Sequence, residues 1–460
     1  MPHRTAAAAD SQRTQAVNPQ DRTVLRLPML LLLASLILCG ATALTLLRPE
    51  TESRVYRLAA ERFLAGETFY RTEPKAFSYP PFCVLPYAPL VALDSTMQRW
   101  AWSAFNLTLF FASLWFVSAM VFPISRRGEA KRQAPHWLCV LIVLLLAGRF
   151  LASPLEYESN DVIILALIVT FAYLQAYARP KLAAVAGGIA AACKATPLLL
   201  LPLLAWQRRF AAAGVFAAVL LAATLLPDLL VRNPAGGAWV NSWYNRFVSK
   251  VNVGEAPKVK GAWIAWNPHN QSLVGTVHRL ATPVKPTAGR INVALGRLEG
   301  IPLKLVPWCL QAAVLAAVFC CSWPKLGEHL APHERPFLHL GQTSAAACGM
   351  LLLSPMSSTQ HFCALLLPIA FIVVHVLYRR TRVWSLGCCA ALGLLGPIAA
   401  QDVIGSEIAD PLAAYGGNTL ITLLCLAACC KILLTEMHLP AAAAPAVAEP
   451  PVETPLRAAA

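Results

Sequence analysis

Long apolar stretches alternate with short polar ones along most of the chain. The apolar stretches lie near residues 28–47, 99–121, 137–151, 161–178, 210–230, 303–322, 337–353, 362–378, 383–400 and 417–434. A transmembrane helix needs roughly 20 mainly apolar residues, and backbone groups in lipid must bond one another, as they do within a helix. The pattern therefore predicts an all-α, polytopic transmembrane helical bundle that crosses the bilayer about ten to twelve times.

Residues 182–206 break the simple count of spans. This apolar segment has basic residues before it and after it, and polar or helix-breaking residues in its middle: Arg179, Lys181, Arg208 and Arg209 at the ends, and Gly187, Gly188, Lys194 and Pro197 within. Basic loops stay on the cytoplasmic side, whereas a single span would place its two ends on opposite sides. We expect two short helices that form a hairpin with both ends cytoplasmic.

Lys194 is a charged residue within this apolar segment. Such a residue is costly in lipid and often functional. Its distance along the sequence from the basic ends is short, and a lysine side chain can extend toward a nearby interface. We therefore favour a structural role for Lys194, near the cytoplasmic side or at the break of the hairpin.

The basic residues elsewhere indicate the orientation. They precede the first apolar stretch and occur in alternate loops, whereas residues 151–160, 354–361 and 401–416 contain no Lys or Arg. The positive-inside rule then places the N-terminus in the cytoplasm. We expect the protein to lie in the inner membrane of the cell. We expect residues 1–27 to form a cytoplasmic tail, 28–436 the transmembrane domain, and the Ala- and Pro-rich residues 437–460 a disordered cytoplasmic tail.

Composition agrees with a membrane protein and narrows the candidate chemistry. Hydrophobic residues make up 57% of the chain and charged residues 13%, against about 25% charged in soluble domains. The net charge of +15 has a topological cause, so no nucleic-acid partner is expected. The 14 cysteines lie mostly in apolar spans and form no zinc or disulfide pattern. Carboxylates with metal-ligand spacing are absent from the external loops, so we expect neither metal nor cofactor.

Two polar regions on the predicted external side are too long to be connectors, residues 48–82 and 231–301. In the first, Val55, Leu58, Ala59 and Phe63 recur at helical spacing. This pattern predicts an amphipathic helix on the membrane surface. Gly66 is expected to end the helix, and Tyr79-Pro80-Pro81-Phe82 to turn the chain back toward lipid.

The second external region is rich in aromatic and amide side chains. It contains Trp239, Trp243, Tyr244, Trp263 and Trp266, followed by the sequence Asn267-Pro268-His269-Asn270-Gln271-Ser272. Aromatic rings beside amide groups suit a carbohydrate, although tryptophans also form interfacial belts in any membrane protein. The polar cluster cannot enter lipid unpaired, so it faces water, protein or substrate.

Four short motifs occur in the same order as in a known family. They are the loop from Val55 to Phe82, the sequence from Ala186 to Leu201 with Lys194 and Pro197, the Asn270-Gln271-Ser272 stretch, and the sequence from Leu351 to His361. On these motifs the chain, over roughly residues 48–380, resembles glycosyltransferase family 87. Characterised members of that family are polyprenyl-phosphate-mannose-dependent mannosyltransferases of the multi-spanning GT-C architecture.

The chain departs from the family pattern at three places. Tyr157-Glu158-Ser159-Asn160 stands where the family commonly has Gly-Gln-x-Asn, so only the Asn is kept. Ser358, Gln360 and a single His361 replace an aromatic residue and paired histidines. Glu52 stands where the family usually has Asp.

The resemblance implies which residues act. Glu52 takes the position of the catalytic general base, in the first external loop and close to the membrane. Its other reading is an ordinary acid at a helix N-terminus, where the helix dipole favours negative charge. The residues that we expect to bind substrate are Arg54, Tyr56, Tyr79, Asn160, Lys250, His269, Asn270, Gln271 and His361.

The resemblance also implies the reaction and its partners. We expect the enzyme to move a sugar, mannose in the first place, with inversion from a polyprenyl-phosphate carrier to the hydroxyl of a glycolipid or glycan acceptor at the external membrane face. The remaining partners are membrane lipids. The alternative from the pattern of spans is a secondary transporter of a small solute or lipid, which would show repeated halves and paired intramembrane charges.

Overall fold

The computed structural model describes residues 46–71, 76–127, 134–251, 267–284, 291–327, 334–379, 383–398 and 405–436, with residues 39, 40, 42, 43 and 330 besides. Most of the predicted first span, both tails, Trp263 and Trp266 lie outside this set. The described residues form helices and connecting segments without a strand, which confirms the predicted all-α class.

Most of the predicted spans correspond to helices. Long helices are α3 (Ser95–Arg127), α4 (His136–Glu156), α8 (Phe210–Leu230), α11 (Gly300–Cys321), α12 (Arg335–Leu353) and α17 (Gly417–Lys431), which continues into η8 (Ile432–Glu436). A further span combines η6 (Thr359–Leu365), α13 (Leu366–Val374) and η7 (His375–Arg379). By length and hydropathy, 6 of these described segments can cross a membrane alone, and α12 is not among them. The protein is thus a multi-pass membrane protein.

The remaining apolar helices are shorter than a bilayer is thick. They are α5 (Asp161–Ala176), α6 (Pro180–Cys193), η3 (Thr196–Leu199) with α7 (Leu200–Trp206), and α14 (Val383–Ile398). A helix of about 14 residues is about 21 Å long, against about 30 Å of hydrocarbon. The predicted total of ten to twelve counted these short helices as crossings, so fewer described helices span alone than the sequence suggested.

The predicted hairpin at 182–206 is present in the structure. Helix α6 ends at Cys193, Lys194 adopts an extended backbone, and η3 begins at Thr196. Lys194 contacts Asp161 at the start of α5, whereas Arg209 contacts Gln175 at the end of α5. The hairpin therefore leaves and returns at one end of the bundle, and its apex lies at the other.

Small residues allow the hairpin to pack closely. A Cβ atom on Gly188 would lie 2.9 Å from the backbone oxygen of Phe216 in α8, and one on Gly187 would lie 2.7 Å from the Phe216 ring. Side chains larger than hydrogen would push α6 away from α8, as in other small-residue helix contacts within membranes.

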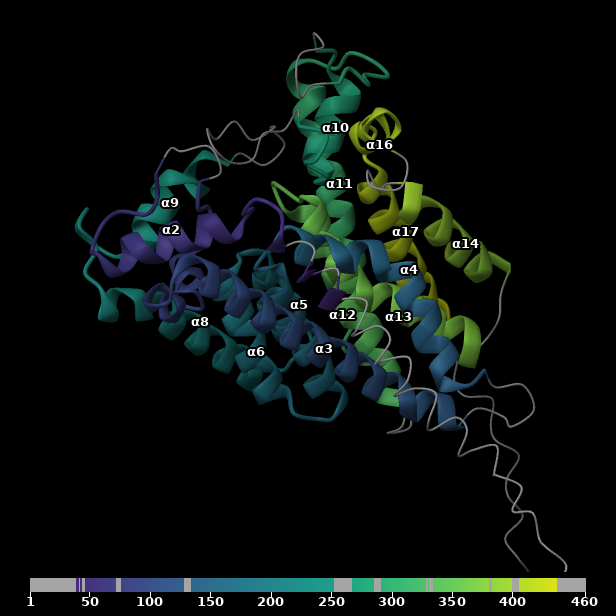
Figure 1. The fold of residues 1–460 in the computed structure, drawn as a ribbon. Coiled ribbons are helices and arrows are strands. Elements are labelled where there is room, and N and C mark those ends of the chain that lie inside the picture. The colour runs from purple at the N-terminus through teal and green to yellow at the C-terminus, as the bar shows by residue number, and fades with distance from the viewer. Residues whose placement is uncertain are drawn as a thin grey trace, which may run out of the picture.

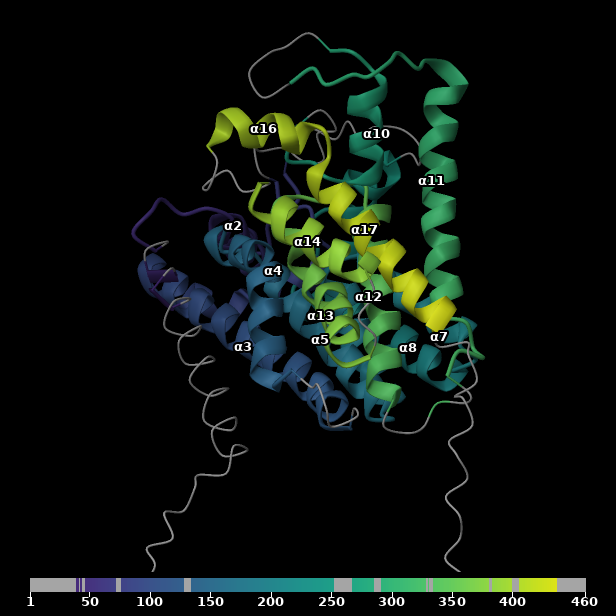
Figure 2. The ribbon, with the colours of Figure 1, turned by 90° about the vertical axis from the view of Figure 1, so that its right-hand side faces the viewer.

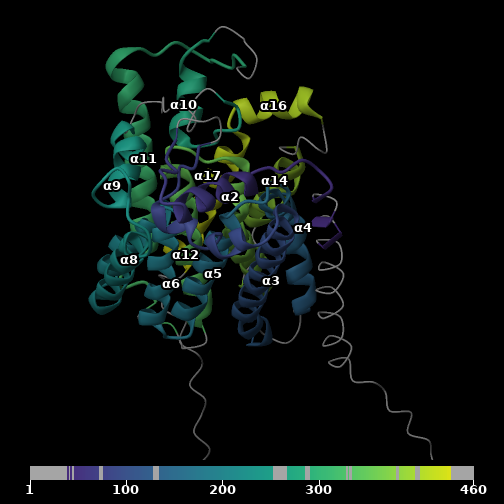
Figure 3. The same ribbon diagram turned by 60° about the vertical axis from the view of Figure 1, so that its left-hand side comes forward.

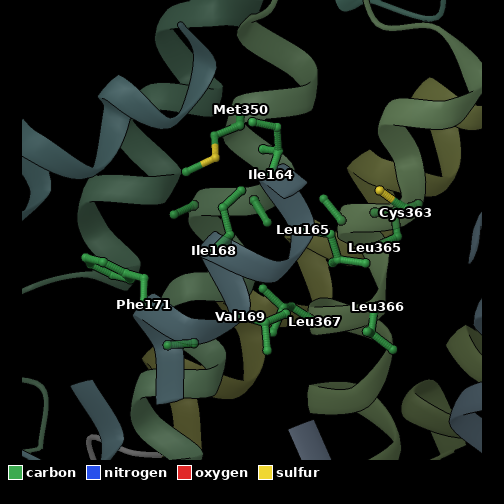
Figure 4. Close-up of a cluster of buried hydrophobic side chains, with 14 of the residues drawn as sticks. Ile164, Leu165, Ile168, Val169, Phe171, Met350, Cys363, Leu365, Leu366 and Leu367 are labelled. Atoms are coloured by element: carbon green, nitrogen blue, oxygen red, sulfur yellow. The ribbon is translucent and has the colours of Figure 1, made fainter. Parts of the chain in front are cut away.

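The core of the bundle lies where α5, α12 and α13 meet. Figure 4 shows Ile164, Leu165 and Ile168 of α5 turned toward Met350 of α12 and Leu365 at the end of η6, directly before α13. All these side chains are buried. Because α12 and α13 are covered on nearly every side by protein, they form the rigid centre against which the polar segments are placed.

Shorter helices gather at one end of this bundle, which we call the α2 end. They are α2 (Ser53–Leu64), α9 (Trp239–Arg246), α10 (Leu273–Ala281) and α16 (Ser406–Ala414). Figures 1 and 3 show α2 lying across the ends of α3 and α5, and Figure 2 shows α16 above α14 and α17. The prediction of a helix ended by Gly66 is confirmed, since α2 ends at Leu64 and Gly66 has a φ of 69°.

The buried face of α2 differs from the predicted one. Tyr56, Ala59, Ala60 and Phe63 are buried against protein, through neighbours such as η2 (Ala88–Ala92), and Val55 is only half-buried. The helix is thus attached to the bundle by an aromatic and small-residue face. Its polar residue Tyr56 is directed inward, which brings a hydroxyl group into the interior.

Candidate functional site

The start of α2 is held against the segment between α4 and α5. Glu158 in that segment accepts hydrogen bonds from the Ser53 hydroxyl and from the Arg99 guanidinium, and the Glu52 backbone N–H donates to Tyr157 at 3.2 Å. Glu158 is buried and has a φ of 53°, a conformation that few residues other than glycine adopt. The paired, buried carboxylate of Glu158 therefore fixes where α2 begins.

Glu52 lies directly before α2 but does not cap it. Its side chain accepts no hydrogen bond from the helix N–H groups. Oε2 of Glu52 instead accepts from the Tyr56 hydroxyl at 2.8 Å, and Oε1 accepts from Nε2 of Gln360 at 2.5 Å. The carboxylate thus points into the bundle, toward η6, rather than toward the helix dipole.

The surroundings of Glu52 make it a stronger base than an exposed glutamate. Burial raises its pKa above the ordinary 4.5, and the nearby carboxylate of Asp161 raises it further, while the Tyr56 hydroxyl and the Lys194 ammonium oppose the rise. A raised pKa moves a carboxylate toward the range in which it takes up a proton from a hydroxyl during catalysis.

Tyr56, Tyr79 and Asn160 surround the Glu52 carboxylate. The Tyr56 oxygen accepts from the Asn160 backbone N–H at 3.2 Å and lies 3.5 Å from the Tyr79 hydroxyl. Burial raises the pKa of both tyrosines well above 10 and Glu52 raises it further, so both stay protonated and serve as donors. The structure brings together these predicted site residues.

A buried ion pair lies beside the Glu52 carboxylate. Nζ of Lys194 is 2.6 Å from Oδ1 of Asp161, and the Ser159 hydroxyl donates to Oδ2 of Asp161 at 2.8 Å. The Lys194 ammonium is also 5.8 Å from the centre of the Tyr79 ring. We call Glu52, Tyr56, Tyr79, Asn160, Asp161, Lys194, Gln360 and His361 the Glu52 cluster.

Of the two places expected for Lys194, the structure shows the break of the hairpin, away from the hairpin's basic ends. The lysine is only 12% exposed and lies in the Glu52 cluster, at the apex of the hairpin. Along the chain, Lys194 is close to the basic residues at the ends of the hairpin. A 14-residue helix nevertheless carries the apex about 21 Å from the hairpin's ends.

His361 completes the cluster from η6. Its Nδ1 accepts from the Ser358 backbone N–H at 3.2 Å, which assigns the proton of a neutral ring to Nε2. Nε2 lies 3.6 Å from Oδ2 of Asp161. His361 therefore faces Asp161 and not Glu52.

A small cavity of about 30 Å³ opens beside the ion pair. Its polar wall includes Asp161, Lys194 and His361, and its apolar wall includes Ile164 and Met350. A space of this size holds a water molecule or a small group of a ligand. The Lys194 ammonium has three N–H donors, and Asp161 uses one of them, so donors remain for an anion.

The second polar region, residues 267–281, forms a different kind of network. Nε2 of Gln271 donates to the backbone oxygens of Pro268 and Ala413, and Oε1 accepts from the Asn418 backbone N–H at 3.2 Å. Oδ1 of Asn270 accepts from the Ser272 backbone N–H at 3.1 Å. Both predicted substrate-binding side chains are buried and bonded to the backbone, although Nδ2 of Asn270 has no hydrogen-bond partner among the described residues.

Arg279 ties the same region to α16. It donates to the backbone oxygens of Ala414 at 2.9 Å and Asn270 at 2.6 Å, and burial lowers its pKa to about 10, so it remains charged. Gly416 has a φ of 87°, and a Cβ atom there would lie 2.3 Å from Thr276. The chain passes so closely that only glycine fits.

The other predicted substrate-binding residues lie outside the Glu52 cluster. His269 is exposed beside a cavity of about 30 Å³ that also contacts Arg149 and Asp410. Lys250 is exposed at the end of η4 (Val248–Lys250), and Arg54 is exposed on the outer face of α2. These residues were predicted because each carries a positive or imidazole group in an external loop. Residues outside a binding site share that property, so it does not distinguish the site from its surroundings.

Asp161, Lys194 and Gln360 are the cluster members that sequence reasoning missed. Each carried a signal, since Asp161 directly follows the family Asn, Lys194 is a charge in an apolar segment, and Gln360 precedes His361. Within the described part of the chain, no three His, Cys, Asp or Glu side chains form a group that could hold a metal ion.

Comparisons with known proteins identify the family of the chain. The sequence model of glycosyltransferase family 87 matches residues 77–355, more than half of the chain. No curated protein matches. Among solved structures, the chain is similar to ArnT from Cupriavidus metallidurans in the apo state, with 14% identity, a TM-score of 0.38 and coverage of 88% of this chain and 76% of that one. The structure of the same protein bound to undecaprenyl phosphate gives 15%, 0.37, 89% and 77%.

Proposed function

Because the chain belongs to glycosyltransferase family 87, we propose that this membrane glycosyltransferase moves a sugar, mannose in the first place, from a polyprenyl-phosphate carrier to an acceptor hydroxyl. The acceptor is a glycolipid or glycan at the external membrane face. The proposal is supported above all by the orientation of the Glu52 carboxylate. It does not cap the N–H groups at the start of α2 and is held instead by the Tyr56 hydroxyl and the Gln360 amide.

The proposed step needs one base. Glu52 takes the proton of the acceptor hydroxyl as its oxygen attacks the anomeric carbon of the donor sugar. The bond between that carbon and the carrier phosphate breaks, and the phosphate leaves with the electron pair. Attack opposite the leaving group inverts the anomeric configuration. A positioned base of this kind supplies a factor of about 10²–10⁴ in rate.

Lys194 is the cation that we propose for the leaving phosphate. Its ammonium group lies beside the base, is largely buried, and faces a cavity that Asp161 and His361 also line. In a water-poor site, a fixed cation stabilises developing negative charge more than it would in water. Asp161 holds the ammonium in place before the donor binds.

The distribution of basic residues supports an external position for the α2 end. Arg179, Lys181 and Arg208 are exposed at the end of the bundle opposite to the Glu52 cluster, where the hairpin begins and returns. Basic loops remain in the cytoplasm. The Glu52 cluster would then face the side on which a flipped lipid-linked sugar is presented.

A direct test incubates the purified enzyme with polyprenyl-phosphate sugars and candidate glycolipid acceptors. The rate of sugar transfer by wild type is compared with that of Glu52→Gln. The matched control is Glu61→Gln, which neutralises a carboxylate on the same helix whose partner, Arg57, lies 3.1 Å away. We expect Glu52→Gln to lose about 10²–10⁴-fold in rate and Glu61→Gln to keep the wild-type rate.

Two outcomes would contradict the proposal. Full activity of Glu52→Gln would remove Glu52 from the mechanism. Failure with every lipid-phosphate sugar, together with measured transport of a solute, would replace the transferase with a transporter.

A further inference from the structure

A second and larger cavity lies on the outer side of α2. It has a volume of about 420 Å³ and is bounded by α2 and by the segment that follows it. Its lining residues on α2 are spaced by three or four positions, which places them on one face of the helix. The Glu52 side chain points to a different face, so this cavity is separate from the Glu52 cluster.

The lining of the cavity is positively charged. Arg54, Arg62 and Arg71 contribute guanidinium groups, and Glu50 contributes a carboxylate. Glu50 is already paired with Arg57 at 2.9 Å. Arg71 is in turn paired with Glu67 at 2.8 Å. The lining itself still contains more guanidinium than carboxylate groups, which favours an anionic ligand.

The rest of the lining is apolar. Val55 and Leu58 form one wall, and Phe69 and Phe77 form the other. Phe69 is stacked on Trp239 with ring centres 4.6 Å apart, so the aromatic wall is fixed from behind. Guanidinium groups beside apolar side chains match an amphiphile with an anionic head better than a free inorganic anion.

The aromatic wall joins this cavity to the Glu52 cluster. The ring of Phe77 lies 5.6 Å from that of Tyr79, and the Tyr79 hydroxyl is 3.5 Å from the Tyr56 hydroxyl. A ligand in the cavity would thus contact both α2 and the segment that carries Tyr79. Its binding would hold these two elements together at the base of the cluster.

We propose that this cavity binds the phosphate headgroup of an anionic phospholipid of the surrounding bilayer. Guanidinium groups bind phosphate with two parallel hydrogen bonds, and arginines near a membrane surface attract anionic lipid. The bound lipid fixes α2 and so steadies Glu52. The site is a lipid site beside the reaction, and its occupancy is measured without any sugar transfer.

The test counts bound lipids on the detergent-purified full chain by native mass spectrometry. Phosphatidylglycerol and phosphatidylcholine with the same acyl chains are titrated in parallel, and inorganic phosphate is added as a competitor. We compare wild type, Arg54→Gln/Arg71→Gln and the control Arg297→Gln, whose guanidinium is exposed elsewhere and paired with Glu299 at 2.7 Å. We expect phosphatidylglycerol to bind about 30-fold more weakly to the double variant and normally to the control.

Each contrary result overturns the proposal. Equal binding of both phospholipids to wild type would show that the charge is not recognised. Displacement by millimolar inorganic phosphate would identify a free-anion site. Binding of a glycolipid acceptor without binding of phosphatidylglycerol would assign the cavity to the substrate. The last two results leave the role of Glu52 untouched, whereas loss of transfer in Glu52→Gln tests only that role.

Discussion

The two polar regions of this protein look alike in sequence but differ in what their side chains contact. In the Glu52 cluster, the charged side chains Glu52, Asp161 and Lys194 contact other side chains. In the region 267–281, Gln271 and Arg279 contact backbone carbonyl groups. The first region keeps titratable groups facing one another, and the second uses its polar groups to fix loops.

This difference shows how a reactive site can be distinguished from polar residues that only stabilise the fold. A buried side chain bonded to the backbone satisfies groups that would otherwise cost free energy. A buried carboxylate held beside another carboxylate is less stable than it would be in water, and such an arrangement is typical of a reactive site. Partner type, rather than the density of polar residues, therefore identifies the candidate site.

Replacing Lys194 tests the first region with the largest expected effect. Lys194→Met should lower kcat/KM by about 10²-fold, because the leaving phosphate loses its fixed cation. The measurement is the initial rate of sugar transfer against donor concentration. Lys250→Met is the control, since Lys250 is an exposed lysine at the same end of the bundle.

The Lys194 variant leaves Asp161 without its ammonium partner, which also affects folding. The double variant Asp161→Asn/Lys194→Met removes both charges and should recover the thermal stability without the activity. Recovery of activity in the double variant would show that Lys194 serves only to neutralise Asp161. An equal loss in Lys250→Met would show that the loss is not specific to the buried cation.

Replacing Gln271 tests the second region. Gln271→Ala removes bonds to Pro268, Ala413 and Asn418 and leaves buried backbone groups unpaired, at a cost of about 1–3 kcal/mol. We expect a lower Tm in detergent and an unchanged kcat for each folded molecule. A fall in kcat at unchanged Tm would instead place Gln271 in contact with substrate.

The pH profile tests whether Asp161 acts on Glu52. The acid limb of kcat/KM reports the base of the free enzyme, and the raised pKa of Glu52 places that limb above 4.5. Asp161→Asn removes a neighbouring negative charge and frees the Lys194 ammonium, and both changes favour the ionised carboxylate. The limb should therefore move to lower pH. A limb that stays in place or moves to higher pH would show that another group titrates.

The sequence predicts the fold of this protein better than its site. Long apolar stretches identify α8 at both ends and α3, α4 and α11 to within about six residues at each end, because a span in lipid has few alternatives to a helix. The break at Lys194 is also predictable from charge and from Pro197. What the pattern does not give is the depth to which the hairpin apex enters the bundle.

The site was partly predictable, and the reason is physical. Tyr56, Tyr79 and His361 belong to the motifs that carry the family resemblance, and Glu52 and Asn160 lie where the chain departs from the family pattern. The structure brings all five together. Asp161 and Lys194 each carried a signal in the sequence, but only the structure shows their contact across 33 positions of the chain. Asn270 and Gln271 stay predictions as substrate-binding residues, because a sequence does not show whether an amide meets a ligand or a backbone carbonyl.

The smallest expected effect concerns stability, and it distinguishes a strained carboxylate from a stabilising one. The pKa of Glu52 is higher in the folded chain than the ordinary 4.5, because of burial and of Asp161. The folded state therefore binds the proton more tightly than the unfolded state. The stabilisation from this group is complete below the unfolded pKa and is lost as the pH rises through the folded pKa.

Glu52→Gln stays neutral, so its Tm should match that of wild type at low pH and exceed it at pH 8. Since Glu61 pairs with Arg57 near the surface, Glu61→Gln should show no such gain. A Glu52→Gln enzyme that is less stable than wild type at pH 8 would mean that the ionised carboxylate holds α2 in place, and the contrast between the two polar regions would then fail at its central residue.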